Sequence, residues 1–319
     1  MRVIFLGGTG PVGLAGIPHL LAGGHEVAVA HTGAHEPGTL GSLEHLHGQR
    51  DLLLAPDGAV ERWRPDAIID TFAGGATAEK AQELGALAER IDAGHLVAVS
   101  SIDVYRHCAD AGVDGNEPTA LARDLLPLHE DAPRRTGPSP GGGTAHDNVA
   151  MEDALCGAKH ITILRPGAIY GPQLHRAVLR EWYLVERVAR GQRALGLPAG
   201  GGQLFHRVAL DRVGRAIAAS LEYAPTGRWA VNVADPQDLT FGALAALVAG
   251  RLSWDWEAED VAWEDSDHPW NVRHPVLVDT SRLRDVLGVA TPEPRQATEE
   301  QIDWLWQHRD DIAAFMSED

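Results

Sequence analysis

Three glycines spaced three residues apart could bind phosphate groups near the start of the chain. Residues 2–6 form a short apolar run, and Gly7, Gly10 and Gly13 follow it. Pro11 stands where a first helical turn would begin, a position that tolerates its missing N–H. A strand, a glycine turn and a helix let a pyrophosphate approach the backbone and bind unpaired N–H groups at the helix N-terminus. The alternative is an ordinary strand-to-helix turn that holds no ligand.

Side chains that could transfer protons follow a second apolar run, residues 95–100. Ser100, Ser101 and Asp103 stand at its carboxyl end, where open α/β sheets bind their ligands. A serine hydroxyl can hydrogen-bond a substrate oxygen, and a carboxyl group can act as general acid or base. The alternatives are a serine satisfied by the backbone and an aspartate that caps a helix or faces water.

The elements that would position these residues alternate between strand and helix. This alternation predicts an α/β fold, a doubly wound parallel Rossmann sheet with a smaller C-terminal substrate-binding lobe. The expected strands are residues 2–6, 26–31, 51–54, 67–70, 95–100, 161–164 and 229–233. The expected helices are residues 12–21, 76–91, 148–156, 178–190, 211–221, 240–252 and 299–315.

The domain boundary is expected at residue 172, where the character of the sequence changes. Residues 1–172 would form the dinucleotide-binding domain and residues 173–319 mainly the lobe, with about 203–240 returning to the first domain. Residues 106–147 break the rhythm, and so long a loop in an α/β domain is usually functional or partly disordered. An acidic stretch with four tryptophans, between 254 and 270, is expected to be a lobe surface or a lid.

Composition and charge exclude several classes of protein. The formal net charge of −18 repels phosphate backbones and disfavours nucleic-acid binding. No apolar run approaches the roughly 20 residues that span a membrane. Cys108 and Cys156 are the only cysteines, which favours a reducing, cytoplasmic location. The first residues enter a core strand at once, so no signal peptide is expected. The sixteen histidines are scattered, with His45 and His47 the tightest pair. Because no cysteine or acid completes a ligand spacing, no metal site is expected.

Several segments together resemble the extended short-chain dehydrogenase/reductases, the NAD-dependent epimerase and dehydratase family, over nearly the whole chain. Residues 7–13 (GGTGPVG) match its cofactor fingerprint, and residues 100–105 (SSIDVY) resemble its strand-five active-site motif. Residues 165–172 (RPGAIYGP) resemble the motif beside the nicotinamide, and residues 128–133 and 276–288 resemble a loop and the closing segment. The resemblance implies an enzyme that binds NAD or NADP and acts on a small polar substrate, such as a sugar derivative or a secondary metabolite.

The catalytic centre departs from the family pattern. The family has a tyrosine and, four residues later, a lysine that lowers its pKa. Here those positions are Thr144 and Asn148, and neither side chain can do the usual work. His146 lies between them and could replace the tyrosine near neutral pH, or it is simply solvated. The resemblance places Ser101 on the substrate and gives Asp103 the role of the dehydratase acid. Tyr105 is expected to be a packing residue.

The adenosine end gives no clear sign of NAD or NADP preference. NAD binding usually shows an acid at the end of the second strand, and NADP binding an arginine nearby. Here the strand ends in His31 and Thr32, and Arg50 could approach from the next strand end, so the cofactor stays open. The predicted cofactor-binding residues are Gly7, Thr9, Gly10, Pro11, Val12, Gly13, His31, Thr32, Arg50, Ala73, Ser100 and Pro166.

Five residues in or beyond the Arg-Pro motif are predicted to reach the substrate. They are Tyr170, His175, Arg176, His206 and Arg207, and the alternative is ordinary surface charge. Glu152 is expected to be a structural ion-pair partner. With the Tyr and Lys pair missing, non-redox proton transfer fits as well as net redox. Residues 7–10 (GGTG) and 24–27 (GHEV) resemble a subgroup of the family that includes chloroplast RNA-binding proteins. A second function class is therefore a pseudoenzyme that binds a dinucleotide or RNA. The resemblance also implies a homodimer.

Overall fold

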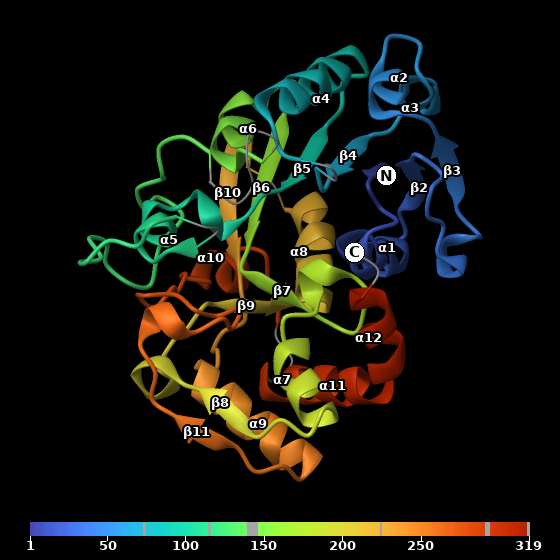
Figure 1. The fold of residues 1–319 in the computed structure, drawn as a ribbon. Coiled ribbons are helices and arrows are strands. Elements are labelled where there is room, and N and C mark those ends of the chain that lie inside the picture. Colours follow the sequence, from blue (N-terminus) through green and yellow to red (C-terminus); the bar gives the residue numbers. More distant parts are fainter. Residues whose placement is uncertain (73–74, 114–115, 139–145, 224, 291–293, 318–319) are drawn as a thin grey trace.

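The computed structural model describes residues 1–72, 75–113, 116–138, 146–223, 225–290 and 294–317 (Figure 1). No helix in these ranges is both long and apolar enough to cross a lipid bilayer.

A seven-stranded parallel sheet forms the centre of the molecule (Figure 1). Its order is β10-β6-β5-β4-β1-β2-β3, so β1 pairs with both β2 and β4 and the winding reverses beside it. The strands are β1 Arg2–Leu6, β2 Glu26–His31, β3 Glu44–His47, β4 Ala67–Asp70, β5 His95–Val99, β6 His160–Pro166 and β10 Gly227–Val233. The doubly wound α/β fold expected from the sequence is confirmed.

Helices cover both faces of this sheet, which explains why its strands are apolar throughout. Val3 and Phe5 of β1 point into one core, together with residues of α1 (Pro11–Ala22) and α8 (Leu210–Glu222). Ile4 and Leu6 point into the opposite core with α4 (Ala78–Arg90) and α6 (Asn148–Ala154). Shorter helices at the sheet's ends are α2 Arg50–Leu54, α3 Ala59–Trp63, α5 Arg106–Asp110 and α10 Ser281–Asp285.

The third strand is not where the sequence predicted it. Residues 51–54 belong to helix α2, in which Leu53 and Leu54 are buried against the sheet. The strand is β3, Glu44–His47, at the sheet edge beside β2. An edge strand with half-exposed side chains carries no apolar run, and the apolar residues that follow it belong to an amphipathic turn of helix. The prediction of a strand at 51–54 was therefore wrong.

A second core lies under the sheet's carboxyl edge and forms the lobe (Figure 1). Its helices are α7 Trp182–Ala189, α9 Phe241–Leu252, α11 Pro294–Gln307 and α12 Arg309–Met316, with the small sheet of β8 Ala194–Gly196 and β11 Glu257–Glu259. A further pair, β7 Ala168–Tyr170 and β9 Arg207–Ala209, lies between this core and the main sheet.

Three expectations for the lobe need correction. The predicted helix 178–190 begins only at Trp182, after a 3₁₀ turn at Arg176–Val178. The predicted helix 299–315 is two helices, α11 and α12, because the chain turns at His308. The tryptophans are not a lid. Trp270 is buried in the lobe core, and Trp254 and Trp256 pack against it, because wide aromatic side chains gain most by leaving water.

A buried histidine makes the stability of the lobe depend on pH. The His268 ring stacks on Phe241 with centroids 3.7 Å apart, and burial lowers its pKa from 6.5 to about 4. The unfolded chain binds a proton on this ring below about pH 6.5, whereas the folded chain does so only near pH 4. Stability that is present above pH 6.5 is therefore lost as the pH falls toward 4.

We expect wild type to lose about 2 kcal/mol more than His268→Phe between pH 7.5 and pH 5, in urea unfolding. His129→Phe changes an exposed histidine and should keep the wild-type slope. Equal losses in wild type and His268→Phe would contradict this account.

Candidate functional site

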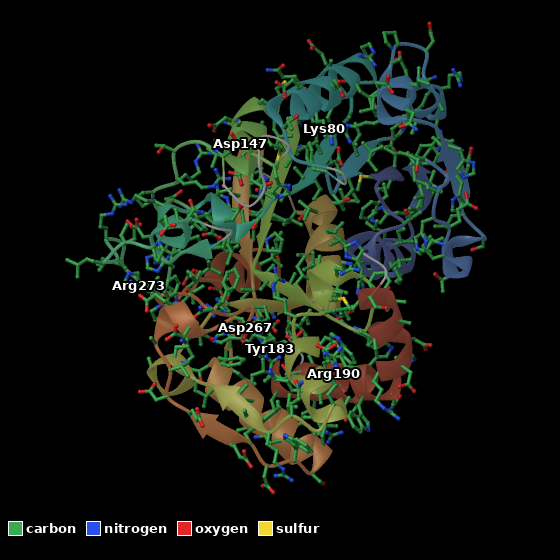
Figure 2. All side chains as sticks on the ribbon, in the orientation of Figure 1. Lys80, Asp147, Tyr183, Arg190, Asp267 and Arg273 are labelled. Atoms are coloured by element: carbon green, nitrogen blue, oxygen red, sulfur yellow. The ribbon has the colours of Figure 1, made fainter. Side chains whose placement is uncertain are left out.

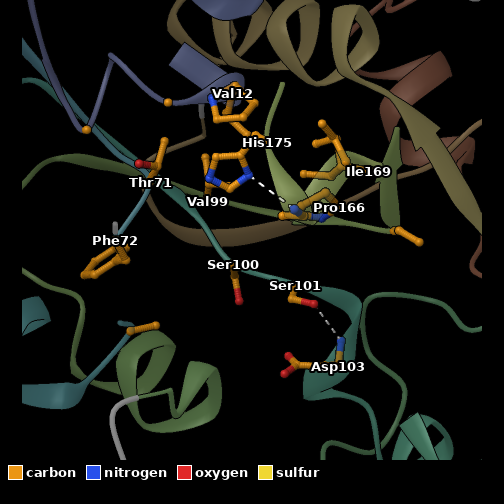
Figure 3. A pocket seen from close by; sticks show the side chains of 18 of the residues that line it. Val12, Thr71, Phe72, Val99, Ser100, Ser101, Asp103, Pro166, Ile169 and His175 are labelled. Atoms are coloured by element: carbon orange, nitrogen blue, oxygen red, sulfur yellow. Dashed lines mark hydrogen bonds between the residues drawn. The ribbon is translucent and has the colours of Figure 1, made fainter. Parts of the chain in front are cut away.

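A cavity of about 820 Å³ lies at the carboxyl ends of β1, β4, β5 and β6 (Figure 3). Its lining includes Gly7 and residues 9–12 after β1, Thr71, Phe72, Gly75 and Ala76 after β4, residues 99–103 after β5 and residues 166–169 after β6. This position is the point where the strand order reverses, which is where open α/β sheets bind ligands. The volume lies in the upper part of the range for small-molecule and cofactor sites.

The glycine turn fits the phosphates of a dinucleotide. Gly10 is the N-cap of α1, and no side chain caps this helix end or brings a carboxylate to its first turn. The N–H groups of Val12 and Gly13 therefore have no partner within the helix and can bind an anion. Gly7 has a φ of +75°, which glycine adopts without strain.

Gly10 and Gly13 do different work within this turn. A Cβ at Gly13 would lie 2.1 Å from the carbonyl oxygen of Gly8, so this glycine lets the helix pack on the turn. A Cβ at Gly10 would have the Gly7 carbonyl oxygen as its nearest neighbour, at an ordinary 3.5 Å. Because Gly10 lines the cavity, a side chain at this position would occupy the space that a ligand needs.

Asp103, Asn148 and His146 meet on the wall of this cavity. The Asn148 Nδ2 group donates to Asp103 Oδ1 at 2.9 Å and lies 3.4 Å from His146 Nε2. The Arg135 guanidinium is 3.8 Å from the Asp103 carboxylate and is itself buried. An amide thus joins a carboxylate and an imidazole, two groups that can exchange protons with a bound substrate.

Ser101 lies beside this group, at the end of β5 (Figure 3). Its Oγ accepts the backbone N–H of Asp103 at 3.1 Å, which caps the 3₁₀ turn Ile102–Val104 and fixes the Asp103 backbone. A hydroxyl that accepts a bond can still donate one. Ser101 can therefore both position Asp103 and bind a substrate oxygen.

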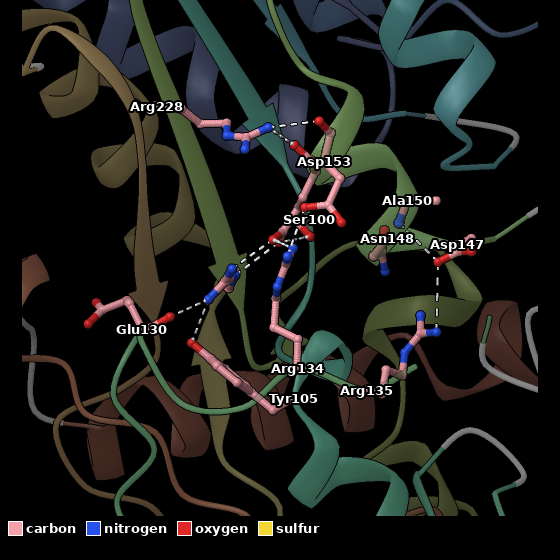
Figure 4. Close-up of polar contacts among 12 residues, drawn as sticks. Ser100, Tyr105, Glu130, Arg134, Arg135, Asp147, Asn148, Ala150, Asp153 and Arg228 are labelled. Atoms are coloured by element: carbon pink, nitrogen blue, oxygen red, sulfur yellow. Dashed lines mark hydrogen bonds and ion pairs between the residues drawn. The ribbon is translucent and has the colours of Figure 1, made fainter. Parts of the chain in front are cut away.

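Ser100 also lines the cavity, but its hydroxyl points into a buried ion pair (Figure 4). Its Oγ donates to Glu152 Oε1 at 2.7 Å, and Glu152 forms a two-bond ion pair with Arg165 at 2.7 and 2.9 Å. Tyr105 accepts a bond from Arg165 and donates to Asn232. Burial raises the pKa of Tyr105 to about 12. Tyr105 and Glu152 are thus structural, as the sequence indicated.

Breaking this ion pair should cost stability. Glu152→Ala leaves the Arg165 charge buried without its partner, and we expect a loss of about 3–5 kcal/mol in urea unfolding. Asp153→Ala is the matched control, because Asp153 pairs with Arg134 at the surface and such pairs contribute at most about 1 kcal/mol. Losses of equal size in the two variants would show that the buried network carries no special weight.

The wall of the cavity toward the lobe has one arginine and two imidazoles, of which His35 comes from the loop after β2. His35, His175 and Arg180 line it there, and burial, aided by the neighbouring His35, lowers the pKa of His175. Among the lining residues that the structure describes, Asp103 is the sole carboxylate and there is no tyrosine or lysine. In a chain of charge −18, this is a local arrangement that suits an anionic ligand.

The predicted cofactor residues fall into two groups. Gly7, Thr9, Gly10, Pro11, Val12, Ser100 and Pro166 line the cavity, and Gly13 supports the turn. His31, Thr32 and Arg50 are not among its lining residues. Arg50 is held by Asp70 at 2.6 Å, so it does not approach the end of β2 as expected. Ala73 and Thr144 lie outside the described residues.

Four of the five predicted substrate residues lie elsewhere. Tyr170, His206 and Arg207 are buried beneath the cavity, where Tyr170 donates to Asp235 and Arg207 pairs with Glu181 at 2.9 Å. Arg176 is exposed and bonds to the carbonyl oxygen of Phe315. These polar side chains join the lobe to the sheet, and only His175 of the set lines the cavity.

The expectation of no metal site stays a prediction, but the fold brings together potential metal ligands that the spacing in the sequence did not indicate. His31, Glu36, His45 and His47 gather at the end of β2 and β3, with one potential ligand atom of each lying within 4.8 Å of the others. The strand pairing that places β3 beside β2 creates this group. A third strand at residues 51–54, as predicted, would not have brought His45 and His47 beside His31.

Arg180, His35 and Gln173 line the cavity but were not predicted. They stand in irregular segments after the second strand and after the Arg-Pro motif, where no periodicity marks which side chain turns inward. Arg180 was predicted to lie in the first turn of a helix over 178–190, whereas the helix begins only at Trp182 and leaves Arg180 in the preceding turn.

Comparison with known proteins gives a match in structure but not in sequence. No protein-family profile matches the chain, and no curated protein sequence matches it significantly. MoeE5, solved with UDP-glucuronic acid and NAD, is 18% identical over 97% of this chain and 100% of its own, with a TM-score of 0.71.

Two further solved structures agree in extent. UDP-glucose 4-epimerase of Thermotoga maritima, solved with UDP-glucose, is 16% identical over 97% of this chain and 100% of its own, with a TM-score of 0.72. The Bordetella bronchiseptica enzyme WbmH, solved with NAD⁺, is 16% identical over 95% of this chain and 98% of its own, with a TM-score of 0.69. This chain therefore has, over nearly its full length, the Rossmann fold with a C-terminal lobe of these proteins.

Proposed function

We propose that this protein is an NAD-binding enzyme of the epimerase/dehydratase type that acts on a sugar derivative carrying phosphate groups. The observation that carries the proposal is one shared cavity. Both the glycine turn at the N-terminus of α1 and the group of Asp103, Asn148 and His146 line it. A ligand that spans the cavity would place its phosphates on the turn and its reacting end at Ser101 and Asp103.

NAD fits this site better than NADP. Arg50, the arginine nearest in sequence to the end of β2, is engaged by Asp70. Glu36 lies 3.7 Å from His31 at that strand end, and a carboxylate there repels a ribose 2′-phosphate. MoeE5 and WbmH were both solved with NAD, which supports the same choice.

The substrate class follows from the lobe side of the cavity. Arg180, His35 and His175 would bind phosphate oxygens. MoeE5 and the Thermotoga epimerase were solved with UDP-sugars, and the two phosphates of a nucleoside diphosphate sugar would meet these three side chains. The proposed substrate is therefore a nucleotide sugar.

The proton chemistry would run without the tyrosine and lysine of the family pattern. Bound NAD supplies a reversible hydride acceptor. Ser101 would hold a hydroxyl or carbonyl oxygen of the sugar, and Asp103 would take up or return the proton at that oxygen or at the neighbouring carbon. Asn148 Nδ2 donates to the Asp103 carboxylate at 2.9 Å, which would keep this carboxylate in place, and the same Nδ2 lies 3.4 Å from His146 Nε2. Such a site suits reactions that return the cofactor unchanged, namely isomerisation or dehydration.

Incubation with NAD and a panel of nucleoside diphosphate sugars tests the proposal. Nuclear magnetic resonance should detect an epimerised or dehydrated product, while absorbance of reduced cofactor stays well below the amount of product. If one reduced cofactor formed for each product molecule, the protein would be a dehydrogenase and the proposal would be wrong. Tight NAD binding without any product from the panel would favour a non-catalytic dinucleotide-binding protein, for which the missing Tyr and Lys pair already speaks.

A further inference from the structure

Three histidines and a glutamate converge at the outer edge of the sheet, away from the proposed catalytic residues. His31 ends β2, His45 and His47 lie on β3, and Glu36 stands in the loop between these strands. The parallel register pairs Val29 with His45 and His31 with His47. His45 and His47 are two apart on one strand, so they share a face of the sheet, and His31 lies beside them.

The separations of the ligand atoms suit a single ion. His31 Nε2 lies 2.8 Å from His45 Nδ1 and 3.7 Å from Glu36 Oε1, and Glu36 Oε1 also contacts His47 Nε2. All four atoms lie within 4.8 Å of one another. Ligand atoms about 2.0–2.1 Å from a tetrahedral zinc ion are about 3.4 Å apart. The observed separations bracket this value, so small side-chain rotations suffice.

The surroundings orient the rings as in metal sites. His45 Nε2 bonds to the carbonyl oxygen of Leu40 at 2.9 Å, which turns its Nδ1 into the cluster. A backbone carbonyl on the second nitrogen is the usual support for a ligating histidine. His31 Nδ1 faces the amide of Gly33 at 3.2 Å, so Nε2 is its inward atom. Zinc binding through Nε2 would place the proton of the His31 ring on Nδ1. The hydrogen bond that Nδ1 accepts from the Gly33 amide would then be lost.

The His31 side chain is nearly fully buried at the centre of this cluster. A divalent cation would bind the three imidazoles and the Glu36 carboxylate at once.

We propose that His31, Glu36, His45 and His47 form a binding site for one Zn²⁺ ion per chain. Three nitrogens and one carboxylate oxygen are a donor set that zinc accepts in tetrahedral geometry. Because the protein fills all four positions, the site is structural rather than catalytic. It clips the loop after β2 onto β3, and the same loop brings His35 to the cavity wall. The site shares His31 and Glu36 with the argument for NAD over NADP, and a zinc titration without nucleotide tests it separately from the proposed function.

The test is a competition titration of chelator-treated protein with Zn²⁺ against a chromophoric chelator, without nucleotide. We expect one ion per chain with a dissociation constant in the micromolar range or tighter, and a rise in the thermal midpoint on loading. Co²⁺ should give the intense visible absorption of four-coordinate cobalt. His47→Ala and Glu36→Gln should each weaken zinc binding about 100-fold and abolish the thermal shift.

Matched controls separate this site from the other histidines. His129→Ala removes an exposed histidine that also has a carboxylate neighbour, Asp279 at 3.7 Å, and should bind zinc as wild type does. The His47 and Glu36 side chains are about half exposed, so their variants should fold, which far-ultraviolet circular dichroism checks. Weak or substoichiometric zinc binding by wild type, or unchanged affinity in both cluster variants, would overturn the proposal.

Discussion

Gly10→Asp is expected to lower the affinity for NAD at least about 100-fold while leaving the thermal midpoint close to that of wild type. The carboxylate would enter ligand space at the N-terminus of α1 and compete there with the pyrophosphate for the same N–H groups. The new Cβ meets only the Gly7 carbonyl oxygen, at 3.5 Å, so the fold has room for it. Calorimetric titration with NAD measures the loss.

Two other glycine variants show which outcome matters. Gly38→Asp adds the same charge where a Cβ meets nothing within 4 Å and where no cavity residue lies, so NAD affinity should stay as in wild type. Gly13→Val forces a side chain against Gly8 and should destabilise the fold itself. If Gly10→Asp bound NAD as tightly as Gly38→Asp, the cofactor would not lie on the glycine turn.

Asp103→Asn should reduce kcat on an accepted nucleotide sugar by about 10²–10⁴-fold, the range for loss of a general acid or base. The amide matches the carboxylate in shape and can still accept the bond from Asn148, so the pocket keeps its form. It cannot take up a proton. NAD affinity and KM should change little, because the lost interaction belongs to the reacting state.

Asp131→Asn is the matched control, since this carboxylate is almost fully exposed and does not line the cavity. It should retain wild-type turnover. His146→Ala tells whether the imidazole shares the work: a pH profile of kcat that loses its limb near neutral pH would place His146 in the proton path. An Asp103→Asn variant with wild-type kcat would remove Asp103 from the reaction.

The parts of the fold that the sequence predicted have strong, local signals. β1, the glycine turn and α1 follow one another within the first 22 residues, and each has its own chemical mark. The same is true of β5 followed by Ser101 and Asp103. The helix expected from residue 240 begins with Thr240 as its cap, whose hydroxyl accepts the amide N–H of Ala243. In these places local preference and tertiary packing agree.

The misjudged parts depend on long-range pairing. β3 has the sequence Glu-His-Leu-His, which carries no apolar run because it is an edge strand. Its register against β2 alone brings three histidines together. Arg207 was predicted to reach the substrate, but it is buried and pairs with Glu181 and Asp238, which are distant in sequence. The spacing of a motif marks such residues as candidates for a site, but it does not indicate which distant side chains they contact in the fold.

Neither of the chain's two lysines, Lys80 and Lys159, is among the residues that line the cavity. Lys80 lies on α4 (Figure 2), and its Nζ donates to the carbonyl oxygen of Gly75 at 2.9 Å. Asn148, which the resemblance to the family places at the lysine position, donates to Asp103 at 2.9 Å. The replacement of the Tyr and Lys pair stays a prediction, and the proposed acid–base group rests on Asp103 and its contacts.

Equilibrium titration of the purified protein with NAD tests the central claim most directly, that the cavity at the carboxyl ends of β1, β4, β5 and β6 holds a dinucleotide. The account predicts saturable binding of one NAD per chain in the micromolar range or tighter, weaker binding of NADP, and loss of binding in Gly10→Asp. No detectable binding of either dinucleotide at millimolar concentration, by a protein shown to be folded, would contradict it.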